Sequence, residues 1–188
     1  MFRGRFKIKL NVTYQLRDKN GKIKPIFQEN GLFRWLMKHN ILSPLAPKIP
    51  FILGNWSDQK IVSNLVTTTG KAGVAARING CGSPAAYNYI ANGTGTTAAV
   101  VGDTALEAET SASGLARATG TASLTTTDTT DDTANLTKTF TSAATVAITE
   151  CGVLNAAVAG ILLSRQVFAA VNVVSGDSWT PLFRYDCD

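Results

Sequence analysis

Residue types that support catalysis are few in this 188-residue chain, and their spacing does not form a recognisable catalytic arrangement. The only histidine is His39, so a Ser-His-Asp or Cys-His site would have to use it. It falls at the polar end of a predicted helix, where the helix dipole favours a histidine without any catalytic role. Glu107 and Glu109 could form an acid–base pair for glycosides, but two glutamates in a Thr/Ala-rich loop are more often solvated. We therefore predict that the chain is not an enzyme.

Candidate nucleotide and metal sites are equally incomplete. The segment 93–95 is Gly-Thr-Gly, but it lacks the lysine followed by Ser or Thr that a phosphate-binding loop requires. Asp128, Asp131 and Asp132 could offer oxygen ligands to calcium, yet their spacing is not that of an EF-hand and a bare turn is the better interpretation. We predict neither a cofactor nor a metal ion.

The cysteines indicate a reducing site of synthesis. Their spacing fits no zinc or haem motif, and their odd number argues against a disulfide framework: Cys81, Cys151 and Cys187. The opening residues 1–10 carry charges but no apolar signal-peptide core, and no run of about 18 apolar residues is present. We expect synthesis in a cytoplasm and no membrane partner, while the role of the three thiols stays open.

One acidic residue has a predicted structural role. Glu150 lies in an apolar strand pattern between Ile148 and Val153. Because a buried acid requires a partner, we expect an ion pair with either Arg165 or Arg117.

The composition indicates a folded chain of one domain, or at most two, with a substantial core. Apolar residues make up 45% and charged residues only 16%, which excludes a disordered polypeptide. Residues 1–60 contain twelve basic and three acidic residues, a net charge of +9, whereas residues 61–188 sum to −4. This asymmetry predicts an acidic partner for the first third of the chain, although a merely soluble basic face is the alternative.

The N-terminal segment predicts a hairpin. Residues 5–17 alternate between apolar and polar types without a fault, which is the period of a β-strand. Asp18–Gly21 is typical of a tight turn, and Lys22–Gln28 would return as a strand whose Pro25 favours a sheet edge. The polar face of the first strand carries four candidate partner-binding residues: Arg5, Lys7, Lys9 and Arg17.

A docking segment is predicted to follow. Residues 30–40 have the apolar spacing of a helix, and residues 43–58 contain three prolines and are expected to be irregular. Such a segment either packs on the body or binds a partner through its apolar candidates: Phe51, Ile52, Leu53 and Trp56.

The rest of the chain predicts a β-sandwich. A short helix over 69–79 would end at Gly80, and Thr-rich strands separated by turns are expected. These strands lie near 87–92, 115–126, 134–142, 145–154, 161–168 and 178–185. The predicted fold is thus mainly β, an antiparallel sandwich with one or two short helices and an N-terminal hairpin or arm. We divide it into a basic docking part, 1–60, and a sandwich body, 61–188.

From Ile61 onward the sequence resembles a group of tailed-bacteriophage virion proteins. Four motifs carry this resemblance in the same order and spacing, and the opening hairpin is similar too. The motifs are Asn64–Gly82, Tyr89–Glu109, Ile148–Asn155, and Leu162–Phe168 followed by Ser175–Ser178.

The resemblance implies a non-enzymatic virion component. We expect a capsid decoration or cement protein on the outer shell, acting as a homo-oligomer and contacting the major capsid protein or neighbouring virion proteins. A tail, collar or fibre-base component of the same particle is the first alternative. A basic single-stranded nucleic-acid-binding protein is the second, disfavoured because Phe6 and Tyr14 fall on the apolar face, away from the basic side chains.

Overall fold

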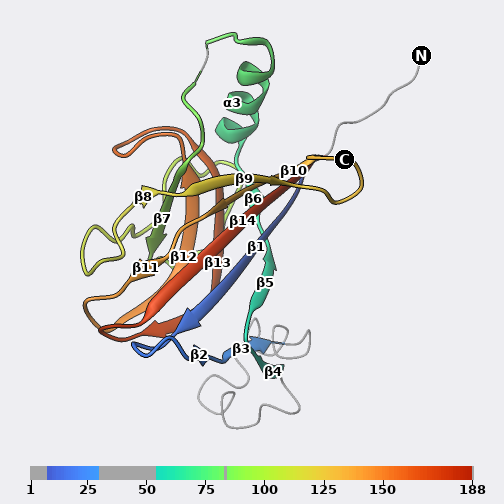
Figure 1. Cartoon of the computed structure of the whole chain (residues 1–188). Helices are drawn as coiled ribbons and strands as arrows, with labels where there is room; N and C mark the ends of the chain where they lie inside the picture. The colour runs from blue at the N-terminus through green and yellow to red at the C-terminus, as the bar shows by residue number, and fades with distance from the viewer. Residues whose placement is uncertain (1–7, 30–53, 83, 188) are drawn as a thin grey trace.

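The computed structural model describes residues 8–29, 54–82 and 84–187. This part of the chain is mainly β, with two antiparallel sheets packed in a β-sandwich-like arrangement and a two-stranded pair at one end (Figure 1). The predicted fold class is confirmed. None of the described helices is long and apolar enough to cross a membrane.

The larger sheet contains both ends of the described chain. Its main order is β2-β1-β14-β10-β9, and β5 and β11 pair with β1 and β14. The bounds are β1 Ile8–Arg17, β2 Ile23–Lys24, β5 Lys60–Ser63, β9 Thr121–Thr125, β10 Thr133–Thr137, β11 Phe140–Thr141 and β14 Ser178–Cys187. Because β1 pairs with β14 along its whole length, the N-terminal strand is part of the same sheet as the C-terminal strand. The division of the chain at residue 60 stays a prediction.

The smaller sheet, in the order β6-β13-β12-β7-β8, packs behind the larger one. Its strands are β6 Leu65–Val66, β7 Tyr89–Gly93, β8 Ala118–Thr119, β12 Val146–Leu154 and β13 Leu162–Val173. Rings from both sheets meet in the core: Tyr14 of β1 lies 4.7 Å from Phe168 of β13 and 4.9 Å from Trp179 of β14, between ring centroids. The buried Trp179 also donates its indole N–H to the buried side chain of Asn92 in β7 at 2.8 Å, which joins the two sheets by a hydrogen bond.

The opening strand follows the predicted alternation, with its described apolar side chains buried from Leu10 to Leu16, except that Thr13 on the predicted polar face is buried too. The predicted return strand over 22–28 is instead two short strands separated at Pro25. Before the proline, β2 pairs with β1; after it, β3 (Ile26–Glu29) pairs with β4 (Gly54–Ser57). Proline has no amide hydrogen to donate to a neighbouring strand, so the ladder is interrupted there. The predicted irregular segment therefore ends in a strand, while its residues 43–53 lie outside the described chain.

One helix is present among the described residues, α3 (Thr68–Asn79), close to the predicted range. Thr67 caps its start by accepting a hydrogen bond from the amide of Gly70, and Gly80 ends it in the left-handed conformation, with φ of 72°. Gly70 lies directly against the backbone of Leu163 in β13, so a side chain at this position would collide with the sheet. The helix predicted over 30–40 lies outside the described residues.

Candidate partner-binding surface

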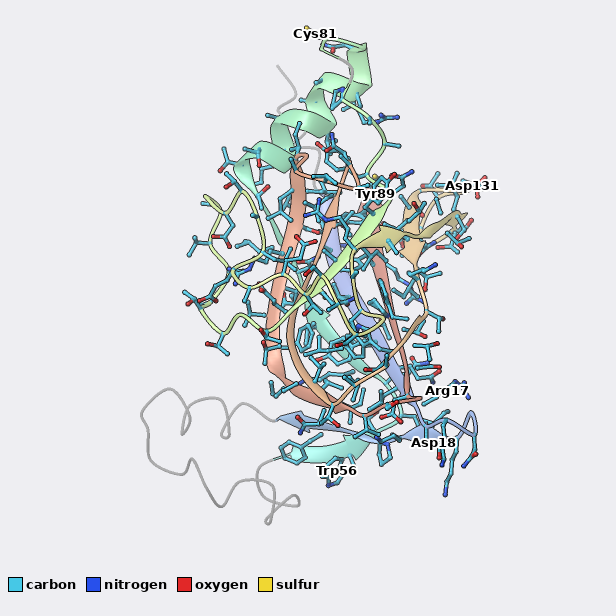
Figure 2. All side chains as sticks on the ribbon, turned by 90° about the vertical axis from the view of Figure 1, so that its left-hand side faces the viewer. Arg17, Asp18, Trp56, Cys81, Tyr89 and Asp131 are labelled. Carbon is cyan, nitrogen blue, oxygen red and sulfur yellow. The ribbon has the colours of Figure 1, made fainter. Side chains whose placement is uncertain are left out.

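Three of the eight predicted partner-binding residues lie in the described chain: Lys9, Arg17 and Trp56. The other five are outside it: Arg5, Lys7, Phe51, Ile52 and Leu53. Lys9 and Arg17 are both exposed on the polar face of β1, but they lie near opposite ends of that strand. The structure therefore does not gather the described candidates into one patch. It places Arg17 and Trp56 at the same end of the molecule (Figure 2).

A rigid cationic turn joins β1 to β2. Arg17 donates hydrogen bonds to the carbonyl of Gly21 at 2.8 Å and to the side chain of Gln15 at 3.1 Å. The carboxylate of Asp18 accepts the amides of Asn20 and Lys22 at 2.8 and 2.9 Å, which closes the turn from inside. The exposed charges on this turn are positive: Arg17, Lys19 and Lys22, while Asp18 is half-buried.

An exposed aromatic ring lies at the same end. Trp56 of β4 is 52% exposed and packs edge-on against Phe27 of β3, with 5.5 Å between ring centroids. The two-stranded pair thus holds one large ring at the surface with its orientation set by a second ring. We call the β1–β2 turn together with Trp56 the cationic end.

The predicted buried acid, Glu150, is paired with one of its two candidate partners. Glu150 is fully buried and accepts a 2.7 Å hydrogen bond from the guanidinium of Arg165, which is also buried. Its two oxygens accept three further amides, from Gly95, Glu107 and Ala108, at 2.7–3.2 Å. Arg117, the alternative partner, instead binds the carboxylate of Glu109.

The sequence did not reveal how far this network extends. Arg165 also binds Asp103 at 2.9 Å and Glu107 at 3.3 Å, so one arginine holds three carboxylates. Hydrogen bonds from Thr97 hold the pKa of Glu107 below its usual value. Glu107 and Glu109, predicted as solvated glutamates, are therefore bound by two different arginines, and the network ties the loop after β7 to the smaller sheet.

The acidic turn between β9 and β10 is ordered by one of its own carboxylates. Asp132 accepts the amides of Thr127, Asp128 and Thr129 at 2.7–2.9 Å. These hydrogen bonds lower its pKa from 3.8 to about 2. Across residues 8–29, 54–82 and 84–187, no three His, Cys, Asp or Glu side chains lie close enough to hold a metal ion.

All three cysteines are free thiols in different surroundings. Cys151 is buried in β12, and burial raises its pKa. Cys81 and Cys187 are exposed, but partial burial together with the carboxylates of Asp186 and Asp132 raises the pKa of Cys187. A raised pKa reduces the thiolate fraction, so Cys187 is a weaker nucleophile than an ordinary exposed cysteine.

An apolar groove of about 590 Å³, unexpected from the sequence, opens at the other end of the sandwich. Its walls come from α3, from β9 and β10, and from the end of β14. The main lining side chains are Val74, Ile78, Leu124, Leu136, Leu163 and Tyr185. In the sequence, the apolar residues Ala122 and Leu124 alternate with polar residues on a Thr-rich strand, which indicates one apolar face. An alternation of only two apolar residues does not predict a groove.

Comparison with known proteins gives no relative from which a function could be transferred: no family model, no curated protein and no solved structure matches the chain. The resemblance to tailed-phage virion proteins accordingly stays a prediction. What the structure defines is a β-sandwich-like protein with a cationic end, an ordered acidic turn and an apolar groove.

Proposed function

We propose that this chain is a non-enzymatic structural component of a tailed-bacteriophage virion, a decoration or cement protein bound to the outside of the shell. The observation that carries the proposal is the cationic end, where Arg17, Lys19 and Lys22 share one end of the sandwich with the exposed ring of Trp56. Aromatic anchors dominate interface energies, and cationic groups accelerate association with an acidic surface and fix its register. The cationic end combines both.

The body supports the same proposal through its rigidity. A protein that reinforces a shell needs a body that keeps its shape under load. Here the buried charges are bound inside the fold: Arg165 holds three carboxylates, and Lys24 binds the buried Asp177 at 2.6 Å. Fully satisfied polar networks of this kind rigidify a structure.

The distribution of charge gives the docking a direction. The cationic end carries Arg17, Lys19 and Lys22, whereas the β9–β10 turn carries three aspartates, so an acidic shell surface would attract the cationic end and repel the turn near Asp131 (Figure 2). The partner of the cationic end is then the major capsid protein or a neighbouring virion protein.

Copy number in purified particles tests the placement on the virion. Quantitative mass spectrometry of particles containing this chain should give a copy number comparable to that of the major shell protein. A handful of copies would overturn decoration in favour of a tail, collar or fibre-base component. Absence from the particle would overturn a virion role altogether.

Binding to empty shells tests the cationic end. We expect Trp56→Ala to weaken shell binding by at least about tenfold, since losing an aromatic anchor costs about 2 kcal/mol. Val158→Ala, at an exposed apolar position in the β12–β13 loop, is the matched control and should bind as wild type. Equal binding by both variants would contradict the assignment. Binding to a single-stranded oligonucleotide with a steep salt dependence would favour the nucleic-acid alternative instead.

A further inference from the structure

β9 is an unprotected edge of the larger sheet. It is the last strand of the order β2-β1-β14-β10-β9, and all five of its residues, 121–125, are exposed. It contains no charge and no proline, and its pairing with β10 has no bulge. Edge strands usually carry one of these features because a bare edge is a template for another strand. β9 is therefore suited to pairing with a further strand.

The register identifies the backbone groups that are available. The amide of Cys187 at the end of β14 donates to the carbonyl of Asp132 at 3.2 Å. Because backbone groups alternate in direction along an antiparallel strand, those of Ala134 and Leu136 in β10 also point to β14. The other residues of β10 face β9, where their partners are Thr121, Ser123 and Thr125. The amides and carbonyls of Ala122 and Leu124 thus point away from β10. No hydrogen bond joins these groups to another described residue.

The same two residues face the apolar groove. Ala122 pairs with Leu136, whose side chain is buried in the core, so the side chains of Ala122 and Leu124 lie on the inner face of the sheet. Leu124 is nevertheless 59% exposed, and Ile78 on the α3 wall is 75% exposed. Available backbone groups and uncovered apolar side chains therefore occur together at this edge.

We propose that a second copy of this chain docks here, with β9 pairing antiparallel to β9 of the second copy about a two-fold axis at Ser123. In this register Ala122 of each copy lies opposite Leu124 of the other, and each such pair exchanges two hydrogen bonds. The larger sheets become continuous, and the groove of each copy is extended by the inner face of the other.

The chemistry of β9 favours a second copy as the occupant. The two-fold axis places Ser123 opposite its own counterpart and Ala122 and Leu124 diagonal to theirs, so a charge at any of these three positions would lie near a like charge. β9 carries none. The register is self-complementary because Ala122 and Leu124, whose backbone groups point away from β10, lie symmetrically on either side of Ser123. The apolar side chain of Ala122 in one copy is then covered by that of Leu124 in the other. The interface is independent of the shell-binding proposal.

A register-specific disulfide tests the pairing. In this arrangement Ser123 faces itself in a non-hydrogen-bonded pair, with about 4.5 Å between Cα atoms, close enough for a disulfide. In a background in which Cys81 and Cys187 are replaced by serine, Ser123→Cys should form a covalent dimer on mild oxidation. Thr121→Cys is the matched control, because Thr121 would face Thr125 of the second copy, and it should stay monomeric on a non-reducing gel.

Sedimentation equilibrium tests the interface without cross-linking. Wild type should be a dimer, and Leu124→Lys should weaken association at least tenfold, whereas Val158→Lys, at a position 84% exposed elsewhere, should not. Ala122→Pro removes an outward amide without breaking the β10 ladder, so it should give a monomer with the circular dichroism of wild type. A monomeric wild type, equal cross-linking at positions 121 and 123, or unchanged association of Leu124→Lys would overturn the proposal.

Discussion

Arg165 shows how one side chain organises a long loop. Its guanidinium is buried and binds Glu150, Asp103 and Glu107, and its Nη2 also donates to the carbonyl of Thr97 at 3.2 Å. The loop after β7 is also anchored by two buried leucines, Leu106 and Leu115. Because the planar guanidinium presents several donors in a fixed geometry, a single arginine can hold several acceptors from this loop at once.

We predict that Glu150→Gln destabilises the fold by about 3–5 kcal/mol, because it removes the buried countercharge of Arg165 and places an amide donor among N–H donors. Urea denaturation provides the measurement. Glu109→Gln is the control: its partner Arg117 lies nearer the surface, so the loss should be about 1 kcal/mol or less. Equal losses would contradict the central place of Glu150 in the network.

At the scale of elements, the β9–β10 hairpin depends on its turn. The loop 126–132 connects the edge strand to β10, and the carboxylate of Asp132 accepts three of its amides. These hydrogen bonds favour the ionised carboxylate, which is the reason for its lowered pKa. The order of the turn is therefore coupled to pH.

The sign of this coupling follows from the pKa of Asp132 being lower in the folded chain than the ordinary 3.8. Its stabilising contribution is complete above about pH 4 and is lost as the pH falls through about 2. We predict that Asp132→Asn is less stable than wild type near neutral pH and that the difference shrinks toward pH 2, as measured by urea denaturation across this range. Asp128→Asn, in the same turn, should change stability little at any pH. A difference independent of pH would contradict the coupling.

At the scale of the whole molecule, the two sheets are held together by rings contributed from distant parts of the chain. Tyr14, Phe168 and Trp179 come from β1, β13 and β14, and each lies within 6 Å of the other two between ring centroids. The N-terminal strand therefore contributes to the core as well as to the charged surface.

We predict that Tyr14→Ala costs about 3–5 kcal/mol, since removing a fully buried ring leaves a cavity between the sheets. Thermal and urea unfolding both report this loss. Gln15→Ala, the next residue and on the opposite face of β1, should change stability by about 0.5 kcal/mol or less. A small effect at Tyr14 would show that β1 is peripheral to the core.

The sequence by itself determined the local features. The alternation of β1 and the turn at Asp18–Gly21 are encoded in adjacent residues, and so are the Thr67 cap and the Gly80 end of α3. Backbone preference and hydrophobic period act within a few residues, so they can be read from the sequence alone. The sequence also predicted that the buried Glu150 requires a basic partner, but it did not decide between Arg165 and Arg117.

Only the tertiary structure decided which distant segments meet. Arg165 became the partner of Glu150 because β13 pairs with β12, and it reached Asp103 because the loop after β7 folds over that pair. The pairing of β3 with β4, the common end shared by Arg17 and Trp56, and the groove beside β9 have the same origin. Such contacts depend on sheet order and register, which arise from the packing of the whole chain and leave no pattern in neighbouring residues.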